Sequence, residues 1–252
     1  MTISGSTRAL AAAAALTVTT LAMLSPAQAQ ASGPLRGAPT VGACSTMTLH
    51  QANARSDRST VVPCGKSHTA QVAGVVTLPD RLHWKTATDQ QLFRVMADKC
   101  EPKVNALLGR DDRTRDSSAY HLVWFEPTKA QRSKGARWLS CSVVIYKATS
   151  LAPLPKTKSP LLPDGALPDR VAACLTKRPF YTPCSARHLW RATGTFVVAG
   201  SYPGQTKLNA KAKRKCLPRV TAGKAYRWTY RDKITWNTGH DHVVVCYSKT
   251  RR

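Results

Sequence analysis

Short runs of valine, threonine and aromatic residues, divided by turn residues, predict strands along much of the chain. In the first half such runs cover residues 59–63 and 69–78, and later ones cover residues 120–125 and 138–146. Their richness in β-branched and aromatic residues is typical of strands in a sheet. The pattern therefore predicts two strands, an intervening segment and two further strands.

The intervening segment has the spacing of a helix. Between residues 89 and 108 apolar residues recur every three or four positions, and Thr88 precedes them as a suitable N-cap. Pro102 lies inside this pattern, so we expect a kink or a restart there, and Gly109 ends the helix. The second half repeats the scheme with a Lys-rich helix near Ala210. The sequence predicts the order β-β-α-β-β twice, an α+β fold with mostly antiparallel sheet.

The chain also matches itself at four landmarks in the same order. A P-C-x-x-x-H motif begins at Pro63 and again at Pro183, and a strand-like run follows each. A C-x-P-[K/R]-V motif begins at Cys100 and again at Cys216, and a turn ending in glycine then precedes the last cysteine of each half. This order predicts two diverged copies of one small domain.

The copies are expected at residues 41–147 and 169–249. Residues 148–168 contain five prolines, which predict an extended and stiff linker. Residues 30–40 are expected to be an unstructured lead-in. Each copy has roughly 80 to 105 residues, enough for only a modest core, so disulfides are expected to decide its stability.

The N-terminus has the features of a secretory signal peptide. Arg8 precedes an apolar run from residue 9 to residue 24, and Pro26 precedes the small-x-small site that ends at Ala29. The alternative is a retained membrane anchor, but a run of about 16 residues is shorter than the roughly 20 that a span requires. We therefore expect residues 1–29 to be cleaved after Ala29, export to the cell envelope or beyond it, and no transmembrane span in the mature chain.

All eight cysteines lie beyond this signal peptide. An even number of cysteines in an oxidising compartment predicts a disulfide framework. The chain has no C-x-x-C pair, which disfavours zinc-knuckle and thioredoxin-like sites. Four cysteines allow three pairings in each half, and the sequence leaves the choice open. The pairs we expect are Cys44–Cys64, Cys100–Cys141, Cys174–Cys184 and Cys216–Cys246.

The motifs of the first half resemble those of the septum formation family of exported actinobacterial envelope proteins. The matching residues are Val41-Gly42-Ala43-Cys44, Val62-Pro63-Cys64, His68, Gln71-Val72, Cys100, Pro127, Gly135, Arg137 and Cys141. Ala43 stands where the family usually has an acidic residue, and Arg132 where tryptophan is common, although Trp236 takes that place in the second half. The resemblance implies a secreted or surface-attached protein connected by name with cell division. It implies no catalytic residues.

The net charge of the chain indicates a further possible class of function, the binding of a polyanion. Lys and Arg number 38 against 13 Asp and Glu, a net charge of +25. Such a charge keeps a secreted protein soluble, or it attracts a polyanion such as a wall polymer or anionic lipid, with nucleic acid disfavoured. The only concentrated cluster, and the candidate polyanion-binding site, comprises Lys207, Lys211, Lys213, Arg214 and Lys215. Helical spacing would gather several of these on one face, whose plainer interpretation is a solvated helix surface.

His68 and His188 stand out because each follows a cysteine by four positions in the repeated motif. A Cys–His nucleophile would require a free thiol of lowered pKa. A disulfide would remove that thiol, so we favour a structural role for both histidines. Their role is otherwise not predicted.

Other polar clusters give weaker signals. His240-Asp241-His242 could supply two metal ligands, but a polar turn is favoured because no further ligands follow at suitable spacing. Asp111, Asp112 and Asp116 predict a solvated acidic loop, because they lack the pattern of a calcium loop. The six tryptophans could stack on sugars, although those on strands are expected to fill the cores. The chain contains no hydrolase, metalloprotease or phosphate-loop motif.

These observations favour a secreted, non-enzymatic protein that binds an anionic envelope component or a partner protein. One alternative is a secreted hydrolase acting on cell-wall material. Another is a structural or protein-interaction module whose charge is incidental. No cofactor or metal is expected, and the sequence predicts no oligomeric state.

Overall fold

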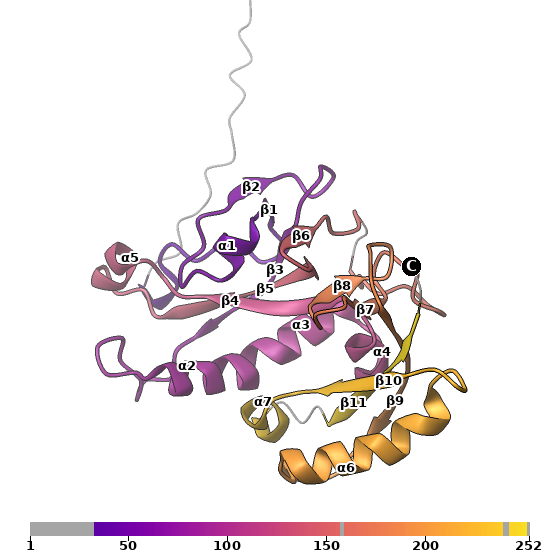
Figure 1. The fold of residues 1–252 in the computed structure, drawn as a ribbon. Helices are drawn as coiled ribbons and strands as arrows, with labels where there is room; N and C mark the ends of the chain where they lie inside the picture. Colours follow the sequence, from indigo (N-terminus) through magenta and orange to yellow (C-terminus); the bar gives the residue numbers. More distant parts are fainter. Residues whose placement is uncertain (1–32, 157–158, 239–241, 251–252) are drawn as a thin grey trace, which may run out of the picture. The chain divides into compact units, whose positions relative to one another are not determined.

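Two antiparallel sheets carry the fold of the computed structural model (Figure 1), which describes residues 33–156, 159–238 and 242–250. The expected signal peptide, residues 1–29, lies outside these residues, as do His240 and Asp241. The first sheet contains β1 (Cys44–Thr46), β2 (Thr60–Val62), β3 (Ala70–Thr77), β4 (Tyr120–Phe125), β5 (Trp138–Lys147) and β6 (Ser150–Ala152). Its strand order is β2-β1-β3-β5-β4, and β6 also pairs with β5.

The second sheet contains β7 (Ala173–Leu175), β8 (Tyr181–Pro183), β9 (Trp190–Val197), β10 (Tyr226–Tyr230) and β11 (Val243–Lys249). Its order is β10-β11-β9-β7-β8. The two sheets therefore have the same strand order. The strands β7, β8, β9, β10 and β11 take the places that β1, β2, β3, β4 and β5 take in the first sheet. The predicted α+β class with antiparallel sheets is confirmed.

The predicted order needs one correction, because three strands rather than two precede the helix in each half. The additional strands are β1 and β7, each of three residues. Each pairs with the strand that follows it and with the longer strand after that. Three residues are too few to show an alternating pattern, and the pairing that stabilises them comes from distant residues.

The predicted helix of the first half is observed with the expected interruption. It consists of α2 (Asp89–Val95), the π-helical turn η2 (Met96–Cys100) and α3 (Glu101–Leu108). Thr88 forms a capping box with Gln91, and Gly109 ends the helix with a φ of 70°. The π turn ends two residues before Pro102, which lacks the N–H that a regular helix would use.

The remaining helical elements are short, apart from the helix of the second half. They are η1 (Gly33–Leu35), α1 (Leu49–Ala52), α4 (Asp112–Asp116), α5 (Lys129–Ser133), α6 (Gln205–Cys216), η3 (Leu217–Arg219) and α7 (Lys233–Thr238). No helix in the described part of the chain is long and apolar enough to cross a membrane.

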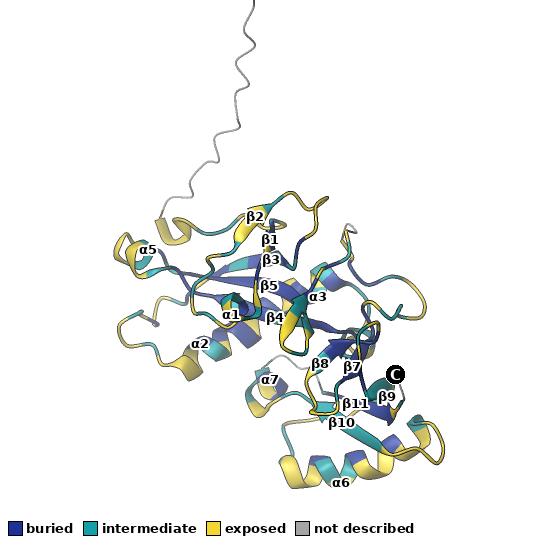
Figure 2. Ribbon diagram, turned by 45° about the horizontal axis from the view of Figure 1, so that its top comes forward, coloured by how far each residue is buried: buried dark blue, intermediate teal, exposed yellow. Residues whose placement is uncertain are grey.

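The helix of each half packs on one face of its own sheet (Figure 1). In the first half Leu92, Val95 and Met96 contact Leu139 of β5 in a buried cluster. In the second half Leu208 and Ala212 of α6, with Trp236 of α7, form the corresponding cluster on β9 and β11. Figure 2 shows the result, with the central strands β5 and β11 largely buried and an exposed outer side of α6.

The four disulfides join the pairs that we expected. Cys44–Cys64 and Cys174–Cys184 each connect the first strand of a half to the segment that follows its second strand. Cys64 lies two residues after β2, and Cys184 lies directly after β8. Cys100–Cys141 and Cys216–Cys246 each fasten the helix to the central strand, β5 or β11. Every disulfide lies within its own half.

A β-bulge occurs at the same point of both sheets. Between β3 and β5 the register skips one residue just before Gly74, which faces Cys141. Between β9 and β11 it skips one residue just before Gly194, which faces Cys246. A bulge of this kind leaves one residue unpaired and bends the strand.

Each of these glycines makes room for the basic residue of the C-x-P-[K/R]-V motif. A β-carbon on Gly74 would lie 2.8 Å from Lys103 Cγ, and one on Gly194 would lie 2.9 Å from Arg219 Cβ. The glycine, the bulge, the cysteine and the basic residue therefore form one packing unit, which explains why these landmarks recur together.

We predict that Gly74→Ala lowers the free energy of unfolding by about 1–3 kcal/mol, because the methyl group would meet the inner carbons of Lys103. Urea unfolding measures the change. Gly65→Ala is the matched control, since a β-carbon there would meet nothing within 4 Å. Equal stability of Gly74→Ala and the control would contradict this packing.

Two segments expected to be irregular are instead packed. In residues 148–168, β6 pairs with β5, and Leu154, Leu161 and Leu162 are buried in the core of the first sheet. Leu161 and Leu162 also donate their backbone N–H groups to carbonyls at the end of α3. The prolines prevent regular structure, but the leucines between them bury apolar surface, so this segment is not a free linker.

The lead-in is also docked where it is described, from residue 33 to residue 40. The carbonyl of Pro34 accepts from the N–H of Arg137, and that of Arg36 accepts from the indole N–H of Trp138 at 3.0 Å. Distant residues of the first half supply these contacts, so local sequence gives no indication of them.

Candidate functional site

The basic cluster predicted from the sequence lies on α6. Leu208, Ala212 and Cys216 form the buried side of this helix, at a spacing of four residues. The disulfide from Cys216 to Cys246 fastens its last turn to β11. The basic residues occupy the other sides, because the apolar positions fix which side faces the sheet.

Most of the cluster is exposed to solvent. Lys207, Lys213, Arg214 and Lys215 are exposed, and Lys211 is half-buried. The spacing of four and then three residues places Lys207, Lys211 and Arg214 in one row along the helix. The structure thus presents a line of three positive charges, with Lys213 and Lys215 on either side of it.

No carboxylate of the residues that the structure describes forms an ion pair with this row. None of the five basic residues pairs with an Asp or Glu in the described part of the chain. From residue 170 to residue 231 the sequence contains 14 Lys and Arg and no Asp or Glu. Positive charges near the C-terminal end of a helix also interact favourably with the helix dipole. This structural role accounts for the basic residues in the last turn of α6 but not for Lys207.

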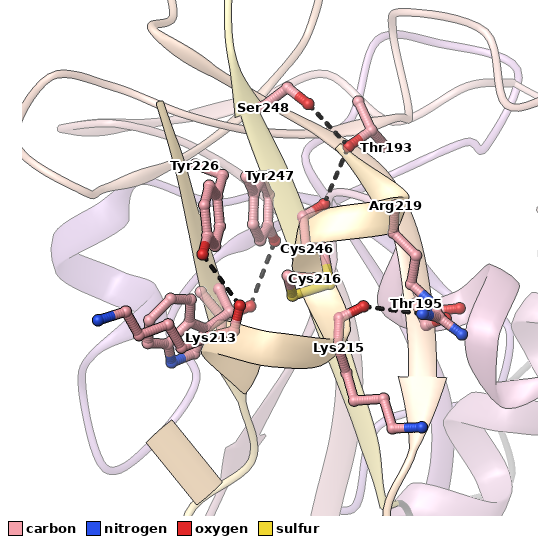
Figure 3. Close-up of a disulfide and its surroundings, with 12 residues drawn as sticks. Thr193, Thr195, Lys213, Lys215, Cys216, Arg219, Tyr226, Cys246, Tyr247 and Ser248 are labelled. Atoms are coloured by element: carbon pink, nitrogen blue, oxygen red, sulfur yellow. Dashed lines mark hydrogen bonds between the residues drawn. A yellow bond between two sulfur atoms is a disulfide. The ribbon is translucent and has the colours of Figure 1, made fainter. Parts of the chain in front are cut away.

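The end of α6 is held rigidly by hydrogen bonds to its last carbonyl groups (Figure 3). Tyr226 Oη donates to the carbonyl of Lys213 at 2.9 Å, and Arg219 Nη1 donates to that of Lys215 at 2.7 Å. Arg219 Nε also donates to the carbonyl of Thr195 at 3.0 Å. The two lysine side chains extend away from the disulfide (Figure 3), so the backbone is fixed while the ammonium groups stay available.

The motif histidines are buried and hold loops in place. His68 is 2% exposed and His188 is 5% exposed. Nδ1 of His68 lies 2.9 Å from the carbonyl oxygen of Lys66, and Nδ1 of His188 lies 2.8 Å from that of Ala186. Each ring therefore fixes the turn after its disulfide, and the neighbouring cysteine is not a free thiol.

Of the acidic residues after Gly109, Asp111 and Asp112 are exposed as we expected, but they cap and begin the short helix α4 rather than lie in a loop. Asp111 caps α4 by accepting from the N–H of Thr114 at 2.9 Å, which lowers the pKa of its carboxyl group. Asp116 is buried, with 7% of its side chain exposed, and pairs with Arg231 at 2.7 Å. Arg231 directly follows β10, so this ion pair joins residues that are far apart in the sequence.

Close to this pair lies a histidine that sequence analysis missed. The ring of His121, on β4, packs against Tyr146 and Tyr181 with centroid distances of 5.0 and 4.3 Å. Its Nε2 atom is buried without a hydrogen-bond partner among the described residues. Burial, and secondarily the charge of Arg231, lower the pKa of His121 to about 3.

This shift predicts a pH dependence of stability. Between about pH 3 and pH 6.5 the unfolded chain binds a proton at His121 that the folded chain does not, so the free energy of unfolding rises with pH by about 1 kcal/mol per unit. His121→Gln should flatten this slope between about pH 4 and pH 6, as measured by urea unfolding. His50→Gln, at an exposed position, should leave the slope unchanged. A slope equally steep in His121→Gln would contradict a buried neutral ring.

No group of three His, Cys, Asp or Glu side chains in the described residues is arranged to hold a metal ion. His242, the one described member of the His-Asp-His sequence, stacks on Trp236 at 5.0 Å, and its Nε2 lies 3.1 Å from the carbonyl oxygen of Trp236. This contact joins α7 to the residue just before β11.

A comparison with known protein families decides the classification. Residues 41–246 match the septum formation family. The chain belongs to this family. The match begins just before β1 and ends in β11, so one septum formation unit contains both sheets. No curated protein and no solved structure matches the chain.

Membership connects the protein with septum formation. Together with four disulfides, which form in oxidising compartments, it indicates an exported protein.

Proposed function

We propose that this septum formation protein acts without catalysis, by binding an anionic polymer of the cell envelope through the basic row on α6. The observation that supports this most is the row itself. Lys207, Lys211 and Arg214 are aligned on a helix that is fastened to its sheet by a disulfide. A polymer with regularly spaced phosphates or carboxylates fits such a row, because several contacts form without reordering the backbone.

The row belongs to the second half alone. We propose that the halves are two diverged copies of one domain, on the basis of their common strand order, bulge, disulfides and histidine contacts. The corresponding helix of the first half contains Asp89, Asp98 and Glu101. Net charge alone would not require an acid-free helix in one copy, so the difference favours a specialised surface on α6.

The hydrolase alternative has less support. It would depend on His68 or His188, but each is buried with its Nδ1 next to a backbone carbonyl, and the cysteines beside them are bridged. A protein partner remains the second alternative. It differs from the polymer in its response to salt, because screening weakens contacts between exposed charges most.

The test is retention of the mature protein by purified cell walls, with and without their anionic polymers, from about 50 to about 500 mM salt. We expect retention by complete walls at low salt, loss of retention as salt rises, and weak retention by stripped walls at all salt concentrations. Retention that depends neither on salt nor on the anionic polymers would contradict the proposal and indicate a protein partner.

A further inference from the structure

An open cleft of about 710 Å³ lies beside β4, the last strand of the first sheet. Its walls come from the residues after α1, the start of α2, β4, the end of β5 and the start of α7. This volume is in the range of sites that bind small molecules or short polymer segments. The basic residues of α6 do not line it.

Three half-buried aromatic residues line the cleft: Phe93 of α2, Trp124 of β4 and Tyr146 of β5. Trp124 differs from most other tryptophans of the chain. The indole N–H groups of Trp84, Trp138, Trp228 and Trp236 donate to protein oxygens at 2.7 to 3.0 Å. That of Trp124 donates to no described residue and is not buried. Trp124 therefore offers both an apolar ring and a free donor.

A fixed polar group stands beside these rings. Arg55 Nε donates to Glu126 Oε1 at 3.1 Å, and the same guanidinium pairs with Asp89. Glu126 is 2% exposed and also accepts from Arg132 at 2.8 Å. The buried carboxylate thus anchors Arg55, while 83% of the Asp89 side chain is exposed at the rim. The donors and acceptors of the cleft are positioned before any ligand arrives.

The charges of the cleft disfavour an anionic ligand. Among the described residues, three of the 13 carboxylates of the chain line it, those of Asp89, Glu126 and Asp232, against one basic residue, Arg55. The protein as a whole has a net charge of +25, but these carboxylates cancel the positive electrostatic potential at the cleft. A ligand suited to it is uncharged, presents an apolar face to an aromatic ring, and carries many hydroxyl or amide groups.

We propose that this cleft binds an uncharged oligosaccharide, with one sugar ring stacked on Trp124. The C–H face of a sugar packs against an aromatic ring, and its hydroxyl groups bond in the ring plane to groups such as the indole N–H, Arg55 and Asp89. The site is separate from the α6 row, so the protein would bind a neutral glycan and an anionic polymer through different surfaces.

The test uses the full mature chain and two probes prepared from purified wall. One probe is glycan freed of its peptides and anionic polymers, with the carboxylates left by peptide removal reduced to alcohols so that it is uncharged, and the other is the released peptides. Titration at about 500 mM salt screens the contacts of α6, so failure here is distinct from failure of the proposed function. We expect the glycan, and not the peptides, to shift the Trp124 indole N–H resonance in NMR spectra while that of Trp84 stays in place.

Variants locate the binding. Trp124→Ala should weaken glycan binding at least about tenfold, the lower end of what loss of an aromatic ring costs where it stacks on a nucleic-acid base. Asp89→Ala should weaken it without affecting folding, because its side chain is mostly exposed. Phe180→Ala, an exposed aromatic residue outside the cleft, should have no effect. Unchanged glycan affinity in both cleft variants, absence of glycan binding, or a Trp124 shift caused by the peptides instead would overturn the proposal.

Discussion

Replacing Cys100 and Cys141 together by alanine is expected to lower the free energy of unfolding by about 4 kcal/mol. The disulfide joins residues 41 positions apart, so it restricts a long loop of the unfolded chain. Both cysteines are also fully buried where the helix meets β5, so their sulfur atoms contribute to packing. The loss is large compared with the roughly 5–15 kcal/mol that stabilises a typical domain. Urea unfolding of the oxidised proteins measures it.

The disulfide between Cys174 and Cys184 provides the comparison. Its cysteines are only 10 positions apart in the sequence. For a loop of this length, loop entropy predicts that the disulfide stabilises the folded protein by about 3 kcal/mol. The double alanine variant there should therefore be the more stable of the two. The opposite order would show that the helix-to-strand disulfide contributes less than its loop length and burial imply.

The triple variant Lys207→Gln, Lys211→Gln and Arg214→Gln should weaken binding to anionic wall polymer by roughly ten- to hundredfold at low salt. Each basic residue near a strongly anionic surface contributes about 1 kcal/mol, and the effect falls as salt screens it. The substituted side chains form no ion pairs within the described residues, so folding should be unaffected. Isothermal titration with purified polymer measures the affinity.

The first half offers a control with the same change in charge. Lys66, Lys85 and Lys129 are exposed and unpaired among the described residues. Replacing all three by glutamine removes three positive charges far from α6 in sequence. If this control weakened binding as much as the α6 variant, net charge rather than the row on α6 would explain the affinity.

The sequence predicted the elements whose signals are local or repeated. The helix from residue 89 to residue 108 follows from its apolar spacing and from Thr88, both of which act within a few residues. The confinement of each disulfide to its own half followed from the recurrence of four cysteines, whereas the choice of pairs within a half was left open by the sequence. The row on α6 followed from the density of lysines together with the expectation of a helix.

Features that depend on distant contacts could not be predicted in this way. The strand β1 is stabilised by pairing with β2 and β3 rather than by its own three residues. The ring of His121 packs against Tyr181, which lies 60 positions away in the chain. The cleft combines Arg55, Trp124 and Asp232, and only the sheet topology brings these three together.

The most direct test of the proposed function is the salt dependence of binding to purified anionic wall polymer, measured for the natural protein, the α6 variant and the Lys66, Lys85 and Lys129 control. Each ionic contact with a polyphosphate contributes about 0.7–0.9 to the slope of log K against log salt. We expect this slope to be shallower for the α6 variant than for the natural protein by about 2–3. The slope for the control should differ from that of the natural protein by less than about 1. Equal slopes for the natural protein and the α6 variant would contradict the proposal that α6 carries the contact.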